Sequence, residues 1–208
     1  MNSYQFAAID IGSNAVRLLV SNVFEHGTTT TFKKQSLVRV PLRLGADAFL
    51  YKHIPDQKAE EFLHAMHAFS HLLKVYKPVK MRALATSAFR EADNGIEIVD
   101  RVFSETGIKI EIISGKEEAE VVYANGLRDN MNADKSYLYM DVGGGSTEIT
   151  LFNNHEDIAA KSFNVGTIRL LMNTVPDETW DEMKSWVKEI SAQINGELAL
   201  IGSGGNIN

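Results

Sequence analysis

One short pattern occurs twice in the 208 residues, first at 10–14 (Asp-Ile-Gly-Ser-Asn) and again at 141–147 (Asp-Val-Gly-Gly-Gly-Ser-Thr). In each copy an apolar run ends in an aspartate, small residues follow, and a β-rich run comes next, at 16–24 and 148–152. This order predicts a strand, a tight turn and a second strand. Because glycine has no Cβ, an anion can approach the backbone N–H groups of such a turn closely. Two such turns could hold a phosphate chain from opposite sides.

Strand and helix patterns alternate around the two turns. Three β-rich segments at 4–11, 16–24 and 28–40 predict a meander, and apolar residues spaced three and four apart predict a helix over 56–76. The other expected elements are a loop at 42–55, strands at 81–85 and 108–113, a helix capped by Asn94 and ending near Gly107, a helix beginning at Ser114, a strand pair over 137–152, a strand at 158–163, a helix over 177–194, and a strand at 198–201 that enters another glycine turn.

The second half restarts the pattern of the first, which predicts two similar α/β domains with a cleft between them. Gly126, Asn130 and Asn132 weaken regular structure, so we place the boundary after residue 125 and expect domains at 1–125 and 126–208. The chain ends in a glycine-rich turn, which seldom forms a natural terminus. We therefore expect the second domain to be truncated.

Composition excludes several classes of function. With no cysteine, the chain cannot form a disulfide, a thiol nucleophile or a thiolate metal site. No apolar run has membrane-span length and no signal segment begins the chain, so we expect a cytoplasmic protein without a membrane partner. Residues 1–90 hold 12 Lys and Arg against 6 Asp and Glu, and residues 91–208 hold 9 against 21. The basic half could attract a polyanion or simply the acidic half, but no cluster interleaves basic and aromatic residues as nucleic-acid binding requires.

The turn at 143–147 is the stronger candidate for an anion site, since a structural hairpin rarely needs three glycines; a plain turn is the alternative. Asp10 and Asp141 each end an apolar strand, where we expect the carboxylate to hold a cation or to cap the turn. Mg²⁺ suits phosphate chemistry and needs only one or two protein carboxylates, of which Glu148 could supply a second.

Ser114 and Glu117 form the Ser-x-x-Glu pattern of a helix capping box. This leaves the adjacent Glu118 as a candidate general base, although an exposed glutamate in a first helical turn is the simpler interpretation. Arg90 follows a short strand and could bind a phosphate or lie at the surface.

Three histidines, His64, His67 and His71, share one stripe of the helix predicted over 56–76 and invite a zinc assignment. The stripe lies roughly opposite the apolar face, so we expect these side chains to face solvent.

Four segments together carry a resemblance to a known family: residues 8–14 (Ala-Ile-Asp-Ile-Gly-Ser-Asn), 85–90 (Ala-Thr-Ser-Ala-Phe-Arg), 113–119 (Ile-Ser-Gly-Lys-Glu-Glu-Ala) and 141–148 (Asp-Val-Gly-Gly-Gly-Ser-Thr-Glu). In this order they closely resemble the exopolyphosphatase/guanosine pentaphosphate phosphatase family, and residues 164–169 and 202–206 extend the resemblance over essentially the whole chain. The resemblance implies two ribonuclease H-like α/β domains with mixed sheets, the fold of actin and hexokinase. Family members continue past the last glycine turn, so it also implies that C-terminal helices are missing.

The resemblance further implies a set of site residues and a reaction. Glu118 matches the catalytic glutamate that activates water, and Asp141 and Glu148 match positions associated with the divalent cation, with Asp10 a third metal candidate. The implied phosphate-binding residues are Ser13, Asn14, Arg90, Gly144, Gly145 and Ser146. The expected substrate is inorganic polyphosphate or guanosine pentaphosphate, hydrolysed at its terminal phosphoanhydride with Mg²⁺. A non-catalytic sensor of these polyanions and an ATP-dependent kinase of the same fold stay open, as does a homodimer.

Overall fold

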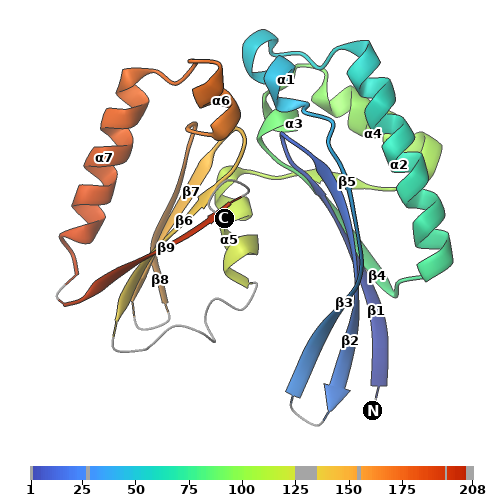
Figure 1. The fold of residues 1–208 in the computed structure, drawn as a ribbon, viewed down its shortest axis with the longest axis horizontal. Helices are drawn as coiled ribbons and strands as arrows, with labels where there is room; N and C mark the ends of the chain where they lie inside the picture. Colours follow the sequence, from blue (N-terminus) through green and yellow to red (C-terminus); the bar gives the residue numbers. More distant parts are fainter. Residues whose placement is uncertain (1, 27–28, 125–134, 154–155, 195, 205–208) are drawn as a thin grey trace. The chain divides into compact units, whose positions relative to one another are not determined.

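The computed structural model describes residues 2–26, 29–124, 135–153, 156–194 and 196–204, and it comprises two compact units, Met1–Ile112 and Ile113–Asn208 (Figure 1). This division lies before the boundary predicted after residue 125. The reason is that helix α5 (Gly115–Ala124) contacts strands β7 (Thr147–Asn153) and β8 (Glu156–Phe163) of the second unit. Residues 125–134, where regular structure was expected to weaken, lie outside the described residues.

The first unit is built on a five-stranded mixed sheet in the order β3-β2-β1-β4-β5. The predicted meander is confirmed: β1 (Asn2–Ile11), β2 (Val16–His26) and β3 (Thr29–Val40) pair antiparallel. Strand β4 (Lys80–Ala85) then pairs in parallel with β1, and β5 (Ile110–Ile112) pairs in parallel with β4. The two parallel additions each follow a helical connection, as parallel pairing requires.

The second unit repeats this topology in a four-stranded sheet of order β8-β7-β6-β9. Strand β6 (Ser136–Val142) pairs antiparallel with β7, β7 pairs antiparallel with β8, and β9 (Leu198–Gly204) lies parallel to β6. Strands β8, β7, β6 and β9 therefore correspond to β3, β2, β1 and β4. The duplicated sequence pattern thus corresponds to a duplicated sheet topology.

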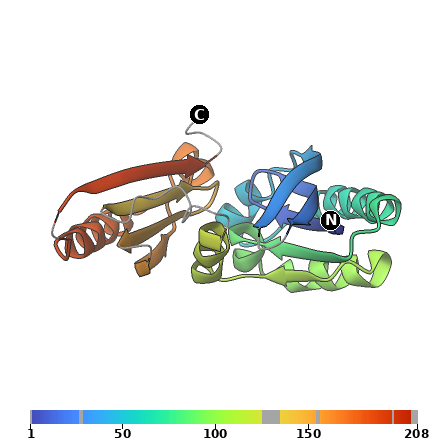
Figure 2. The same cartoon turned by 90° about the horizontal axis from the view of Figure 1, so that it is seen from below.

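Helices of the first unit cover one face of its sheet (Figures 1 and 2). Helix α2 (Asp56–Tyr76) matches the predicted helix and packs against α4 (Gly95–Thr106), which ends at Gly107 with φ 74°. The buried face of α2 includes Phe62, whose ring centroid lies 4.9 Å from that of Phe89. On the same helix His64 and His71 are exposed and His67 hydrogen-bonds Glu105 at 3.0 Å, so the interpretation of this stripe as solvent-facing is confirmed.

Two short helices of the first unit were not predicted. Helix α1 (Gly45–Tyr51) lies within the expected loop at 42–55, where Ala48 and Phe49 are buried, and α3 (Ser87–Glu91) follows β4. Helices of seven and five residues are too short to show a repeating apolar period. Asn94 precedes α4 as expected, but its amide bonds the backbone N–H and C=O of Ile54 instead of capping the helix.

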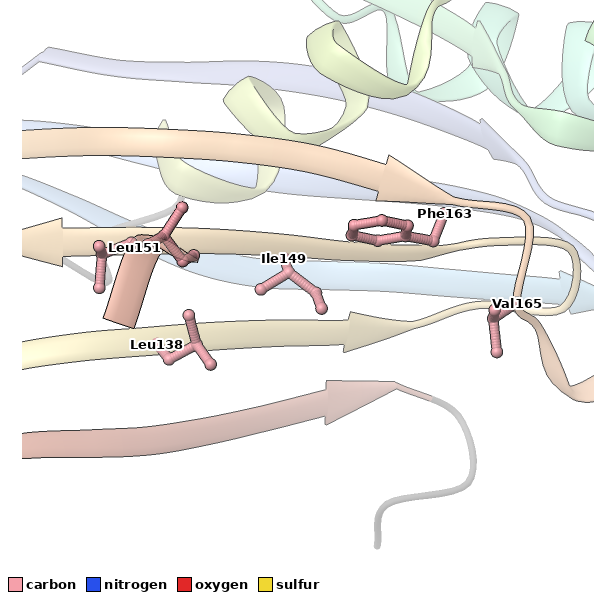
Figure 3. Packing of buried hydrophobic residues seen from close by; sticks show 6 residues of the cluster. Leu138, Ile149, Leu151, Phe163 and Val165 are labelled. Carbon is pink, nitrogen blue, oxygen red and sulfur yellow. The ribbon is translucent and has the colours of Figure 1, made fainter. Parts of the chain in front are cut away.

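The second unit buries its apolar core on one face of its sheet, beneath α7 (Asp177–Ser191). Figure 3 shows Leu138, Ile149, Leu151 and Phe163 of β6, β7 and β8 gathered there, and Trp186 of α7 meets Phe163 with ring centroids 5.5 Å apart. Because side chains alternate along a strand, the residues between these core positions lie on the opposite face. That opposite face carries the polar residues of the candidate site. No helix in the described segments is long and apolar enough to cross a membrane.

Candidate active site

The two repeated turns have the same backbone geometry. In the first, the N–H of Gly12 donates to the carbonyl of Ala15 at 3.1 Å, and in the second the N–H of Gly143 donates to the carbonyl of Ser146 at 2.9 Å. The first hydrogen bond closes the turn between β1 and β2, and the second closes the turn between β6 and β7. The prediction of a strand, tight turn and strand in both places is confirmed.

The carbonyl groups of the second turn are bound by helix α6 (Thr167–Leu171). The N–H groups of Thr167 and Ile168 donate to Gly143 and Gly144 at 3.0 and 2.9 Å, and the buried guanidinium of Arg169 donates through Nε to the carbonyl of Gly145 at 2.7 Å. The described peptide bonds are trans, so each N–H points away from the carbonyl of the same peptide unit. The N–H groups of the next three residues therefore point away from α6; these residues are Gly144, Gly145 and Ser146.

Gly166 permits this close approach of α6 to the turn. A Cβ on residue 166 would collide with the backbone of Gly144 and Gly145, which cannot move aside as a flexible side chain could. Gly144 is partly exposed, whereas Gly145 and Ser146 are buried. The hydroxyl of Thr147, the next residue, donates to the carbonyl of Val165. Sequence reasoning did not predict α6 or the contact made by Arg169.

The first turn is held in a similar way. The carbonyls of Ser13 and Asn14 accept hydrogen bonds from the N–H groups of Gly45 and Arg43, at 2.8 and 3.0 Å. The buried hydroxyl of Ser13 also lies 2.8 Å from that of Ser87 in α3. The structure thus joins the first turn to helix α3, which carries Arg90, a predicted phosphate-binding residue that is half-buried. Asn14 is exposed.

Four polar residues form a row across the second sheet. Ser203 of β9 pairs with Asp141 of β6, Asp141 pairs with Glu148 of β7, and Glu148 pairs with Ser162 of β8. Ser203 donates to Asp141 Oδ1 at 2.5 Å, and Ser162 donates to Glu148 Oε1 at 2.7 Å. Two carboxylates therefore stand opposite each other on neighbouring strands, each bonded to a serine from an outer strand. Sequence reasoning assigned roles to both carboxylates but to neither serine, although Ser203 lies in the segment 202–206 that carries the resemblance, because strand register brings these residues together.

The first unit has an ion pair at the corresponding position. Asp10 pairs in register with Arg17, whose Nη1 lies 2.7 Å from Asp10 Oδ2, and half of the Asp10 side chain is exposed. Asp10, expected to hold a cation or to cap its turn, is thus paired with an arginine at the surface. Glu148 takes the place of Arg17 in the second unit, where it is only 3% exposed. Like charges opposite one another in a sheet repel, so the carboxylate pair favours a nearby cation.

The donor set of this pair fits Mg²⁺. Among the described residues no group of three or more His, Cys, Asp and Glu side chains could hold a metal ion. Mg²⁺, however, prefers oxygen donors, keeps several waters and is commonly bound by one or two carboxylates. Asp141 and Glu148 supply such a pair beside the glycine turn.

Helix α5 begins beside this row. Its predicted capping box is confirmed, since Ser114 N–H donates to Glu117 Oε2 at 2.8 Å and Glu117 N–H donates to Ser114 Oγ at 3.2 Å. Gly115 lies so close to β8 that an added Cβ would stand 2.5 Å from the Cβ of Ser162. Glu118, half-buried in the first turn of α5, is therefore carried on an element that touches the serine bound to Glu148.

A hydroxyl also supports the row from within β6. The Tyr139 hydroxyl lies 2.5 Å from Ser203 Oγ, and Tyr139 is 7% exposed. Burial raises the pKa of the Tyr139 phenol above its ordinary value, although the hydrogen bond to Ser203 acts in the opposite direction. The phenol thus keeps its proton at neutral pH and can donate it in a hydrogen bond.

Comparison with known proteins identifies the family. The sequence profile of the Ppx/GppA phosphatase family matches residues 19–202. A bifunctional 3-dehydroquinate synthase/phosphatase of Fusobacterium nucleatum is 32% identical over 202 residues, covering 90% of this chain and 30% of the relative. Exopolyphosphatase 1 of Mycobacterium tuberculosis is 28% identical over 174 residues, covering 84% of this chain and 50% of the relative. The chain thus spans half or less of the length of these curated relatives.

Solved structures show the same fold. The Aquifex aeolicus member of the Ppx/GppA family has a TM-score of 0.77 at 23% identity, over 99% of this chain and 68% of its own. An exopolyphosphatase from Cytophaga hutchinsonii has a TM-score of 0.76 at 24% identity, over 95% of this chain and 66% of its own. These likenesses confirm the predicted α/β fold with two mixed sheets of the actin type. With the profile matching most of its length, the chain belongs to the Ppx/GppA phosphatase family.

Proposed function

We propose that this protein hydrolyses the terminal phosphoanhydride bond of inorganic polyphosphate or guanosine pentaphosphate. The observation that carries the proposal is the second glycine turn, whose three carbonyls are bound by α6. Membership of a phosphatase family supports hydrolysis. The name of the mycobacterial relative, exopolyphosphatase, favours a polyphosphate substrate.

Phosphate binding is assigned first to the backbone of the second turn. The N–H groups of Gly144, Gly145 and Ser146 point away from α6, and Gly144 is the most exposed of the three. Since α6 already holds the turn, little reorganisation is needed when phosphate binds. In the first unit we assign phosphate binding to Ser13, Asn14 and Arg90.

We assign the divalent cation, Mg²⁺, to Asp141 and Glu148. When bound there, Mg²⁺ would offset the negative charge of the phosphates and polarise a phosphoryl oxygen. The carboxylates themselves repel the polyanion, so they assist binding only through the cation. The role of Asp10 as a further metal contact stays a prediction.

Glu118 is assigned as the general base. Its carboxylate would accept a proton from the water that attacks the terminal phosphorus, while the phosphoanhydride bond breaks and the shortened chain leaves. The capping box at Ser114 and Glu117 fixes the first turn of α5 and hence the place of Glu118.

The test is phosphate release from polyphosphate and from guanosine pentaphosphate, with Mg²⁺ and with excess chelator. We expect release that requires Mg²⁺ and that Asp141→Asn reduces by more than about 10-fold, since even an outer residue that orients a metal ligand contributes about 10- to 100-fold. Asp157→Asn is the matched control, because Asp157 is an exposed aspartate on β8 of the same sheet. Binding of both substrates without release would favour the sensor, and phosphate transfer from ATP to an acceptor would favour the kinase.

A further inference from the structure

We propose that Ser203 and Ser162 are positioning residues that orient the Asp141 and Glu148 carboxylates toward a divalent cation. The inference rests on the proposed function, which assigns the cation to these carboxylates. It adds two residues from the outer strands of the sheet.

The hydrogen-bond direction at Ser203 follows from chemistry. An ionised carboxylate only accepts hydrogen bonds, so Ser203 must give its hydroxyl hydrogen to Asp141 Oδ1. The contact between Tyr139 and Ser203 then needs the phenol as donor. The result is a directed chain, Tyr139 to Ser203 to Asp141, in which each group has one orientation. Such a chain holds the plane of the Asp141 carboxylate.

Ser162 acts in the same way from the other side. It donates to Glu148 Oε1 at 2.7 Å, and its own place is fixed by the close approach of Gly115. Glu148 is nearly fully buried, where a carboxylate is costly without hydrogen-bond donors. Ser162 therefore both lowers this cost and sets the direction of the carboxylate.

The geometry of the sheet places the two carboxylates within reach of one ion. Asp141 and Glu148 are directly opposite on antiparallel strands, where Cβ atoms are about 4.5 to 5.5 Å apart. Each serine binds one oxygen of its carboxylate. Outer groups that orient metal ligands typically contribute about 10- to 100-fold to metal affinity.

The experiment is a titration of the full protein with Mn²⁺ in the absence of substrate, following free Mn²⁺ by electron paramagnetic resonance. We expect Ser203→Ala and Ser162→Ala each to raise the Mn²⁺ dissociation constant by about 10- to 100-fold. Ser203→Thr keeps a hydroxyl and should restore most of the affinity. Tyr139→Phe should weaken Mn²⁺ binding by less than Ser203→Ala does. This variant tests the contribution of the Tyr139 hydrogen bond while Ser203 is still present.

Ser136→Ala is the matched control. Ser136 is a buried serine of β6 in the same sheet, where it pairs with β9, and its hydroxyl donates to Asn153, so its loss should change stability but not Mn²⁺ affinity. Equal Mn²⁺ affinity in the wild type, Ser203→Ala and Ser162→Ala would overturn the serine assignment alone. Absence of binding by the wild type would overturn both this inference and the proposed metal site.

Discussion

Replacing Gly115 with alanine should impair catalysis more than stability. The new Cβ would stand 2.5 Å from the Cβ of Ser162 and 2.7 Å from its Oγ, whereas ordinary contact begins at 3.4 Å. Helix α5 and strand β8 would have to separate by the difference, about 0.9 Å. Both sides of this contact carry proposed site residues, because Glu118 lies one turn along α5 and Ser162 binds Glu148.

The size of the effect follows from this displacement. Overpacking of this kind typically costs about 1 to 3 kcal/mol of stability. A misplacement of about 1 Å at a catalytic group can lower the rate by about 100-fold. We therefore expect Gly115→Ala to remain folded while its kcat for phosphate release falls by about two orders of magnitude.

A double-mutant cycle separates the clash from other causes. Ser162→Gly removes the Cβ that obstructs alanine, so in that background Gly115→Ala should cost much less, whereas in Ser162→Ala the clash persists. Gly107→Ala serves as a control: its positive φ of 74° makes alanine strained, yet nothing lies near its Cβ, so it should lower the urea midpoint without lowering kcat. An unchanged kcat in Gly115→Ala, or additive effects throughout the cycle, would refute the reasoning.

Three further predictions concern the residues that hold the second glycine turn and the ion pairs of Arg101 in the first unit. Arg169→Gln should cost about 1.5 to 3 kcal/mol in urea unfolding and raise KM, because the buried guanidinium holds the carbonyl of Gly145; an unchanged KM would contradict this. Gly166→Ala should lower the urea midpoint more than Gly107→Ala, since its Cβ would meet backbone, and equal midpoints would count against that packing. Arg101 lowers the pKa of Glu60, and His67 together with Arg101 lowers that of Glu105. The stabilisation that these two carboxylates contribute is therefore present above the ordinary value of 4.5 and is lost as pH falls through the lowered values. The midpoint of thermal unfolding of Arg101→Met should accordingly depend less on pH below about 4.5 than that of the wild type. Salt should reduce this difference because the groups are exposed. Identical pH dependence in the two proteins would contradict the assignment.

Local sequence patterns were sufficient for the parts of the fold that depend on local order. The meander, helix α2 and the capping box at Ser114 and Glu117 follow from periodicity and spacing, and all are confirmed. Helices α1, α3 and α6 were not predicted, because their five to seven residues are stabilised by contacts distant in sequence. One example is the close packing of Gly166, which precedes α6, against the backbone of Gly144 and Gly145.

The candidate site divides in the same way. Asp141 and Glu148 could be named from the sequence because they flank one turn. Ser162 and Ser203 were given no role, since only the pairing register of four strands sets them in one row with the carboxylates. Asp10 forms an ion pair and Asp141 faces a second carboxylate, and this difference also depends on strand register. The register places Arg17 opposite Asp10 and Glu148 opposite Asp141.

The most direct test of the account compares two neighbouring glutamates, Glu118→Gln and Glu117→Gln, in Mg²⁺-dependent phosphate release from polyphosphate. Glutamine can replace glutamate in a capping box, so Glu117→Gln should retain activity close to that of the wild type. Glu118→Gln cannot accept the proton from water and should lose about 100- to 10,000-fold in kcat while polyphosphate binding persists. Equal activity in the two variants would contradict the assignment of Glu118 as the general base.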